Sequence, residues 1–212
     1  MKIIISGGGT GGHIYPALAV ADALKKAAPQ TEILFVGAKG KMEMQQVPAA
    51  GYPIIGLSVQ GLQRNRLLAN LKFPFKLVKA LWQSHQLLKT FRPAVVLGTG
   101  GYASGPLLYM AARHGIPTLI QEQNAVAGFT NRMLGRYADK VCVAYEQLTQ
   151  YFPPQKIVLT GNPVRQGIRT LGGKRTAAHA HFGLSPHKKC LLVLGGSGGA
   201  LTINESILQG LD

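Results

Sequence analysis

The sequence predicts an α/β protein built on a Rossmann-like, doubly wound parallel sheet. Short runs rich in Ile, Val and Leu alternate with longer segments of helical periodicity, which is the pattern of parallel strands joined by crossover helices. A unit of strand, glycine-rich loop and helix also recurs three times, starting at residues 3, 95 and 191. With 212 residues, 46% of them hydrophobic, the chain can bury a large core.

The elements of the first part of the chain follow in that order. Strands are expected where aliphatic runs lie between turn residues, at 2–6, 32–37, 94–98 and 117–121. Helices are expected where apolar residues recur at helical spacing, at 15–27, 67–91 and 106–115. Pro74 should begin or kink the second of these helices, because proline has no amide N–H to donate.

A region punctuated by Gly and Pro separates the third repeat from the other two. We therefore expect an N-terminal domain over residues 1–163, a linker over 164–188 and the start of a second Rossmann-like domain over 189–212. One strand, one loop and one helix cannot cover both faces of a parallel sheet. We expect the second domain to be truncated in this chain.

The charge balance indicates an anionic partner. The chain has 23 Lys and Arg against 8 Asp and Glu, a formal net charge of +15, which suits nucleic acid, an acidic lipid surface or a phosphorylated substrate. The two cysteines, Cys142 and Cys190, form no disulfide or metal-binding pattern, which fits a reducing cytoplasm. The N-terminal apolar run is too short for a secretory signal, and no apolar stretch is long enough to cross a membrane.

The first glycine-rich loop can be compared with known phosphate-binding templates. Gly7, Gly9 and Gly12 match the dinucleotide fingerprint between a strand and a helix. An NAD site also needs an acidic residue at the end of the second strand, where residues 38–41 (Ala-Lys-Gly-Lys) offer none. Basic residues there could suit a 2′-phosphate, so an NADP-binding oxidoreductase domain stays open as an alternative.

Other templates fit less well. No Gly-Lys-Ser or Gly-Lys-Thr completes a P-loop, and no Asp-x-Asp pair could hold a metal-bound diphosphate, so no metal is expected. Residues 195–199 match the nucleophile elbow of α/β-hydrolases, but no histidine follows Ser197 to complete a triad. Backbone N–H groups and helix N-termini are the expected binders of diphosphate oxygens, in a cleft shared by the glycine-rich loops.

His13 follows the first loop directly, at the start of the expected helix. A neutral imidazole at this position can accept a proton at neutral pH, which makes His13 a candidate general base. The alternative is a histidine that only caps or hydrogen-bonds the turn.

The middle of the chain is both basic and apolar. No Asp or Glu occurs between residues 44 and 121, and Lys72, Lys76 and Lys79 fall on one face of an expected helix. The apolar arc of that helix is wider than one core contact needs, which suits a helix lying on an anionic membrane surface. The alternatives are an ordinary core helix with solvated lysines, or a module that only binds lipid or another anionic surface. RNA binding is a minor alternative, and we expect no nucleic acid partner, because the aromatic residues form no strand platform for stacking bases.

Five motifs together carry a resemblance to a known family. In chain order they are GGTGGHIYPALA, VVLGTGGYASGP, GIPTLIQEQNAVAGFTNR, GNPVR and GGSGGA. In this order and spacing they closely resemble the glycosyltransferase family 28 enzymes that convert lipid I to lipid II in bacterial peptidoglycan synthesis. The resemblance runs through essentially all 212 residues, and QEQNAVAGFTNR and GNPVR are not generic Rossmann features. It departs at Gly198, where the family commonly has Gln.

The resemblance implies an inverting N-acetylglucosaminyltransferase with two Rossmann-like domains in the GT-B arrangement. The donor would be UDP-N-acetylglucosamine, and the acceptor would be lipid I, undecaprenyl-diphospho-N-acetylmuramoyl-pentapeptide, which attacks through its 4-hydroxyl. It implies no cofactor and a peripheral place on the cytoplasmic face of the bacterial plasma membrane. Because the nucleotide would bind mainly to the second domain, we expect this chain alone to fold its first domain but to transfer no sugar.

The resemblance also implies roles for individual residues. His13 corresponds to the histidine usually proposed as general base, with Glu122 as a nearby acidic candidate. The donor contacts would be Thr10, Gly11, Gly12, Asn124, Arg165 and Ser197. The acceptor's diphosphate site would be lined by Gly100, Gly101 and Tyr102. The membrane-facing residues expected from the helix pattern are Lys72, Phe75, Lys76, Lys79 and Trp82.

Overall fold

The computed structural model describes residues 1–59, 73–169, 172–195 and 199–210. The chain divides into two compact units, Met1–Arg165 and Gln166–Asp212. We refer to them as unit 1 and unit 2.

Unit 1 is built on a seven-stranded sheet in which every described pair of neighbouring strands is parallel. The spatial order is β3-β2-β1-β4-β5-β6-β7, so the strand order reverses between β1 and β4. The strands are β1 (Lys2–Gly7), β2 (Glu32–Ala38), β3 (Ile54–Leu57), β4 (Val95–Gly100), β5 (Thr118–Glu122), β6 (Lys140–Val143) and β7 (Ile157–Leu159). Ligands of doubly wound sheets bind at such a reversal, beyond the carboxyl ends of the strands.

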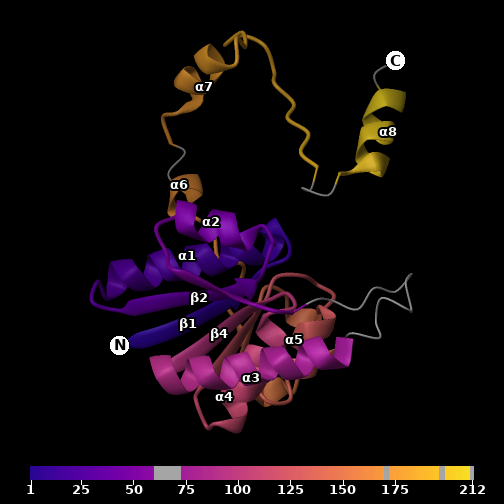
Figure 1. Cartoon of the computed structure of the whole chain (residues 1–212). Coiled ribbons are helices and arrows are strands. Elements are labelled where there is room, and N and C mark those ends of the chain that lie inside the picture. The colour runs from indigo at the N-terminus through magenta and orange to yellow at the C-terminus, as the bar shows by residue number, and fades with distance from the viewer. Residues whose placement is uncertain (60–72, 170–171, 196–198, 211–212) are drawn as a thin grey trace. The chain divides into compact units, whose positions relative to one another are not determined.

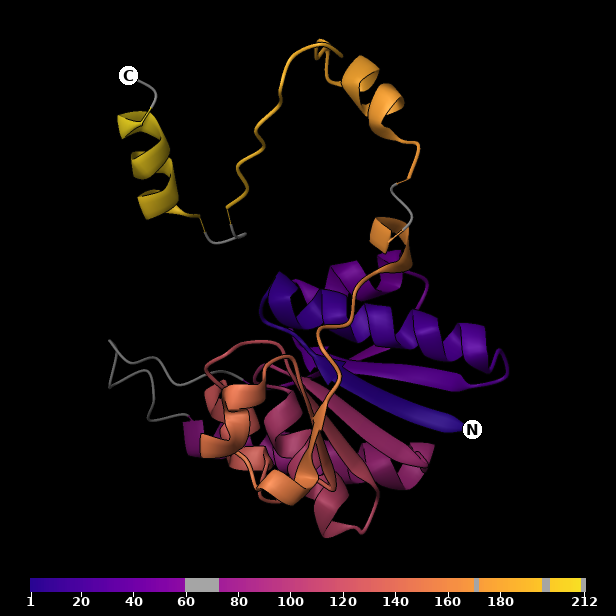
Figure 2. The same ribbon diagram turned by 180° about the vertical axis from the view of Figure 1, so that it is seen from behind.

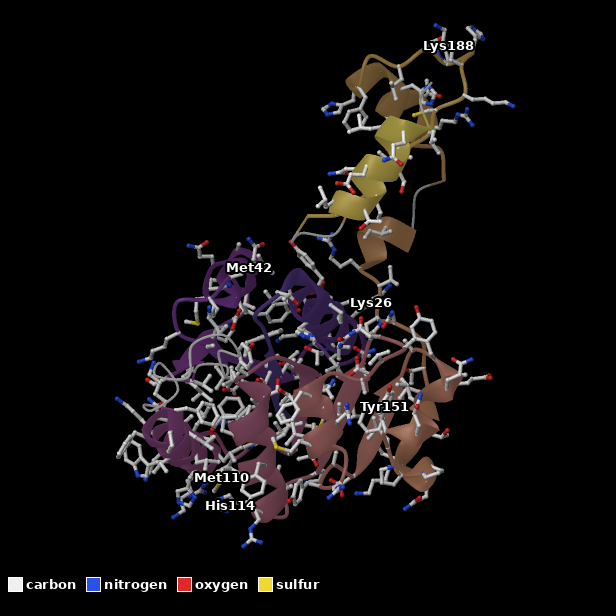
Figure 3. All side chains as sticks on the ribbon, turned by 90° about the vertical axis from the view of Figure 1, so that its right-hand side faces the viewer. Lys26, Met42, Met110, His114, Tyr151 and Lys188 are labelled. Atoms are coloured by element: carbon white, nitrogen blue, oxygen red, sulfur yellow. The ribbon has the colours of Figure 1, made fainter. Side chains whose placement is uncertain are left out.

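Helices cover both faces of this sheet, as the doubly wound prediction requires (Figures 1 and 2). On one face lie α1 (Gly11–Ala27) and α2 (Glu43–Ala49). On the other lie α3 (Phe73–Phe91), α4 (Ser104–Arg113) and α5 (Phe129–Leu134). In Figure 3, Met42, just before α2, and Met110, in α4, lie on opposite sides of unit 1.

The core of unit 1 consists of two layers, one on each side of the sheet. Successive strand residues point to opposite faces, and Ile3 and Ile5 of β1 accordingly pack in the layer under α1 and α2. Ile4, between them, packs in the layer under α3 and α4. A strand buried on both faces must be apolar at every position, which explains the uninterrupted Ile-Ile-Ile run.

Local chemistry sets the helix ends. α1 starts at Gly11 after the extended Thr10, and its last turn carries Lys25 and Lys26, whose charge suits the negative end of the helix.

The hydroxyl of Tyr52, which precedes β3, donates to Asp22 of α1 at 2.7 Å. Burial, followed by the hydrogen bond and charge of Asp22, raises the pKa of Tyr52.

Unit 2 contains α6 (Gln166–Arg169), α7 (Arg175–His181) and α8 (Leu201–Gln209) among its described residues. The helix expected after the third glycine-rich loop is confirmed by α8. The prediction of a strand at 191–194 is wrong, because those residues are exposed and form no strand. A strand needs a partner for its backbone N–H and C=O groups, and the described part of unit 2 offers no other strand.

The two-layer core makes Phe35→Ala a test of the fold. Phe35 is fully buried under α1 and α2, with its ring centroid 5.3 Å from that of Tyr52. We expect Phe35→Ala to lower the free energy of unfolding by about 3–5 kcal/mol, measured by urea denaturation. Ile55→Ala, at a 42% exposed position of β3, is the control and should cost about 1 kcal/mol or less. Equal losses would contradict the two-layer packing.

Candidate functional site

The first two glycine-rich loops meet at the carboxyl ends of β1 and β4. The amide N–H of Gly8 donates to the carbonyl of Gly100 at 3.3 Å. A side chain on Gly101, whose φ is +93°, would collide with the backbone of Gly8. The loops can approach this closely only because both are glycine at the point of contact.

His13 lies where these loops meet, in the first turn of α1. Its Nδ1 is 2.9 Å from the carbonyl oxygen of Thr99 and 3.2 Å from Oε1 of Gln123. The hydroxyl of Thr99 donates in turn to the backbone carbonyl of His13 at 2.7 Å. Gly100 leaves room for the imidazole, since a Cβ there would lie 2.7 Å from the ring. Thr99 therefore holds His13 at both its backbone and its ring.

The partners of Nδ1 define the tautomer of the neutral ring. The amide nitrogen of Gln123 donates to the carbonyl oxygens of Thr99 and Gln121, at 2.8 and 2.9 Å. This orientation directs the oxygen of the Gln123 amide at His13. Two oxygen acceptors therefore face Nδ1, which must carry the proton. Nε2 of the neutral ring then has a lone pair that can accept a proton.

The start of α1 leaves backbone donors without acceptors. The amides of His13 and Ile14 both donate to the carbonyl of Thr10. In the described part of the chain, the N–H groups of Thr10, Gly11 and Gly12 have no acceptor. Three consecutive N–H groups at the positive end of a helix attract the oxygens of an anion.

The second loop leads into another helix at the same edge of the sheet. Gly100 and Gly101 have φ of +112° and +93°, and Tyr102 is exposed just before α4. Since β1 and β4 are neighbours, the positive ends of α1 and α4 both belong to the edge where the strand order reverses.

Glu122 is buried and is the last residue of β5. Its exposed fraction is 1%, and its carboxylate accepts four hydrogen bonds. The donors are the amides of Asn124 and Gly128 and the side chains of Asn124 and Asn131, at 3.0 to 3.1 Å. None of its described hydrogen bonds reaches His13. The ring of His13 instead faces Gln123, which follows Glu122 in the chain.

The segment GNPVR packs against this same loop. The side chain of Asn162 accepts from Gln121 at 3.3 Å and donates to the carbonyl of Gln123 at 3.2 Å. The guanidinium of Arg165 lies 4.6 Å from the centroid of the Tyr15 ring, two residues beyond His13 in α1. Of the expected donor contacts, Asn124 is hydrogen-bonded to Glu122 and Arg165 lies over the Tyr15 ring of α1. Ser197 lies outside the described residues, as does Gly198, where the sequence departs from the family.

One face of α3 presents apolar side chains to solvent. Phe75, Val78 and Trp82 are 79%, 66% and 61% exposed, and their spacing places them on one side of the helix. Lys76 and Lys79 are exposed beside them. The helix packs inward through three other residues, Ala80, Ser84 and Leu88. Lys72 lies outside the described residues.

Two further groups lie outside this site. Burial raises the pKa of the Cys142 thiol on β6, which disfavours its reactive thiolate form. On the α3 and α4 side, Nδ1 of His85 is 2.8 Å from Nε2 of His114, which Figure 3 places at the far end of unit 1 from Met42. Partial burial, followed by the charges of Lys89 and His114, lowers the pKa of His85.

Sequence reasoning missed four residues that shape the site. Thr99 and Gln123 contact the ring of His13. Asn162 joins the GNPVR segment to Gln123. Glu43 accepts the amide N–H of Gly9 in the first glycine-rich loop. Thr99, Gln123 and Asn162 all lie in motifs that carry the family resemblance. Their roles were missed because Thr99 and Gln123 contact a residue 86 and 110 positions away in the chain, which no local pattern reveals.

Within the described residues, no group of three or more His, Cys, Asp or Glu side chains could hold a metal ion. None of the described helices combines the length and the apolar character needed to span a bilayer.

Comparison with known proteins identifies the family. Residues 3–143 match the model of the glycosyltransferase family 28 N-terminal domain. The UDP-N-acetylglucosamine–N-acetylmuramyl-(pentapeptide) pyrophosphoryl-undecaprenol N-acetylglucosamine transferase of Phocaeicola vulgatus is 56% identical over 212 residues, which is 100% of this chain and 56% of the relative. The transferase of the same name from Flavobacterium psychrophilum is 56% identical over 211 residues, covering 100% of this chain and 58% of the relative. The chain thus spans little more than half the length of these relatives.

Solved structures agree with this assignment. The crystal structure of Acinetobacter baumannii MurG is 36% identical, with a TM-score of 0.63 over 79% of this chain and 47% of that one. A UDP-N-acetylglucosamine 2-epimerase shares the fold alone, at 18% identity and a TM-score of 0.57, over 76% of this chain and 48% of that one. With a family model that matches residues 3–143 and relatives at 56% identity, the chain belongs to glycosyltransferase family 28.

Proposed function

We propose that this chain is the acceptor-binding part of an inverting glycosyltransferase that forms lipid II. The enzyme transfers N-acetylglucosamine from UDP-N-acetylglucosamine to the 4-hydroxyl of undecaprenyl-diphospho-N-acetylmuramoyl-pentapeptide in peptidoglycan synthesis. The observation that carries the proposal is that two oxygen acceptors face Nδ1 of His13, which directly follows three N–H groups that have no acceptor among the described residues. A base and an anion site, side by side at the sheet edge, are what transfer from a nucleotide diphosphate sugar requires.

In this proposal, the diphosphate of each substrate binds to a different glycine-rich loop. The diphosphate of the donor meets the N–H groups of Thr10 to Gly12, with Asn124 and Arg165 as further contacts and Ser197 on the second domain. The diphosphate of the acceptor lies against Gly100, Gly101 and Tyr102. Two helix N-termini supply positive potential without a metal ion, so the proposal requires no cofactor.

The chemical step follows from the tautomer of His13. Nε2 removes the proton from the acceptor's 4-hydroxyl as its oxygen attacks the anomeric carbon of the donor from the face opposite the leaving group. The bond from that carbon to the diphosphate breaks, and UDP leaves with its charge stabilised by Arg165, Ser197 and the loop N–H groups. The Thr99 carbonyl and the Gln123 amide then stabilise the imidazolium through its Nδ1 proton.

Glu122 has a different role in this proposal from the acidic catalyst suggested by resemblance. With both oxygens engaged by four donors from residues 124–131, it has little capacity to move a proton to or from substrate. We propose that it shapes the loop that carries Asn124, and that His13 alone is the base.

The exposed face of α3 is the proposed membrane contact. Phe75, Val78 and Trp82 offer apolar area, and Lys76 and Lys79 lie beside them to attract anionic headgroups. A protein that takes a lipid-linked acceptor gains from lying on the membrane that holds it. We propose a peripheral location on the cytoplasmic face of the bacterial plasma membrane.

We propose that the rest of the donor site corresponds to the part of the Phocaeicola vulgatus transferase that residues 1–212 do not match, since the chain spans 56% of that relative. We propose residues 1–163 as the acceptor domain, 164–188 as the connection and 189–212 as the start of the donor domain. We expect no sugar transfer from residues 1–212 alone.

His13→Ala tests the general base. In a version of the enzyme that carries both domains, we expect turnover to fall by about 100-fold or more, with donor affinity changed only a few-fold. His114→Ala, which alters a histidine at the far end of unit 1, is the matched control and should retain activity. Turnover of the His13 variant within a few-fold of the parent would end the general-base proposal.

The tautomer can be measured in the 212-residue chain itself. In ¹⁵N NMR of the imidazole at alkaline pH, we expect the neutral His13 ring to carry its proton on Nδ1. Gln123→Leu removes one of the two acceptors and should increase the Nε2–H form, whereas Gln150→Leu, at an exposed position, should not. A parent ring protonated mainly on Nε2 would refute the assigned tautomer.

Membrane contact can be tested by sedimentation with vesicles of phosphatidylglycerol and phosphatidylethanolamine. We expect binding at low salt that high salt reverses. Lys76→Glu should weaken it by roughly tenfold or more, since each basic residue near an anionic surface contributes about 1 kcal/mol and the change reverses a charge. Trp82→Ser should also weaken it, and Lys140→Glu, on β6, is the control. Absence of binding at low salt would remove the membrane proposal.

A further inference from the structure

Glu43 is a buried acid that the proposed reaction does not use. It begins α2, and its exposed fraction is 0%. Burying a carboxylate is costly unless hydrogen-bond donors meet its oxygens. The donors here are backbone amides: Oε2 accepts the N–H of Gly9 and Oε1 accepts the N–H of Ala38, both at 2.9 Å. One side chain thus joins the first glycine-rich loop to the end of β2.

The surrounding backbone leaves space for this carboxylate. A Cβ built on Gly8 would collide with the Glu43 carboxylate, and one built on Gly37 of β2 would collide with its Cγ. Glycine at both positions is therefore required for Glu43 to lie where it does. The fit is shared by three segments of the chain: the first loop, β2 and α2.

The first loop has few other restraints. Gly9 has a φ of +85°, a conformation that glycine adopts at little cost but whose freedom must be removed on folding. The neighbouring Gly8 amide makes only a 3.3 Å bond to Gly100. The bond from Gly9 to a carboxylate is shorter and charge-assisted. Because Glu43 takes the N–H of Gly9, the unpaired donors of the loop start at Thr10.

The position of Glu43 also explains why the loop resembles a dinucleotide site without being one. In dinucleotide-binding sheets, an acidic side chain at the end of the second strand accepts hydrogen bonds from ribose hydroxyls. Glu43 lies at that place, beside Ala38, but both of its oxygens bind this chain's own backbone. It acts as an internal ligand, and its complete burial keeps it from meeting a ribose.

We propose that Glu43 is a positioning residue that fixes the first glycine-rich loop by accepting the N–H groups of Gly9 and Ala38, so that the N–H groups of Thr10 to Gly12 are presented to phosphate oxygens. The fixing of the loop stands on the contacts alone. Its benefit to phosphate binding rests on the proposed function.

The test compares Glu43→Gln with Asp139→Asn in the 212-residue chain. A glutamine has one oxygen, so one of the two backbone N–H groups would face an NH₂ group. Asp139 is a matched control, because it also accepts a backbone amide, that of Thr118 at 2.8 Å, but at the amino end of β5. Two readouts are needed: hydrogen exchange of the Gly9 amide by NMR, and the Kd for inorganic pyrophosphate.

We expect Glu43→Gln to speed Gly9 exchange and to weaken pyrophosphate binding, each by about tenfold or more, while Asp139→Asn leaves both within about twofold. If Glu43→Gln lowers only the melting temperature, as Asp139→Asn does, Glu43 is a structural acid and the proposal is overturned. Unchanged Gly9 exchange would overturn it as well.

Two other results remain decisive. If the parent chain binds no pyrophosphate, the anion site of the proposed function fails, while faster Gly9 exchange in Glu43→Gln would still support the fixing of the loop. If Glu43→Gln does not fold, Glu43→Asp replaces it. Aspartate keeps the charge but is one methylene too short to reach both amides, so Gly9 or Ala38 should lose protection from exchange, and protection of both would refute the proposal.

Discussion

The site depends on the close approach of two glycine-rich loops. Gly8 touches Gly100 and Gly101 through backbone atoms alone, and this contact brings the first turn of α1 against the end of β4. Only then can Thr99 reach the backbone and the ring of His13. A larger side chain at the contact would separate the loops, and the imidazole would lose the acceptors that set its tautomer. Glycine at these positions matters mainly because it lets the His13 side chain lie against Thr99, and less because of the turn that the glycine itself forms.

Two of the eight acidic residues are buried around this site, and both bind the chain's own backbone. Glu43 holds the first loop and Glu122 holds the loop after β5. Their charge is matched by amide dipoles at short range. They give the loops definite shapes while the unpaired amides of α1 stay available to an anion. Acids beside glycine-rich loops can therefore have a structural purpose that a search for catalytic pairs overlooks.

The sequence predicts the long elements well and the short or unsupported ones poorly. The four strands expected in the first part of the chain are confirmed, because their apolar runs are long and bounded by turn residues. β3, β6 and β7 have only three or four residues each, too few for a periodic signal. The run at 191–194 has the composition of a strand, but composition does not supply a partner. His13 could be singled out because it follows a motif directly. Thr99 and Gln123 could not, since they act on it through contacts between distant segments, and Glu43 lies beyond the residues where the fingerprint seeks an acid.

The hydrogen bonds of Asn162 link the segment that follows the sheet to the residues around His13. Asn162 lies where the chain leaves the sheet after β7, and it is bonded to Gln121 and Gln123, the second of which orients the imidazole. The segment that leaves the sheet after β7 and the residue that orients the His13 ring therefore belong to one hydrogen-bond network. Asn162 binds the backbone carbonyl of Gln123, and the side chain of the same residue faces the imidazole of His13.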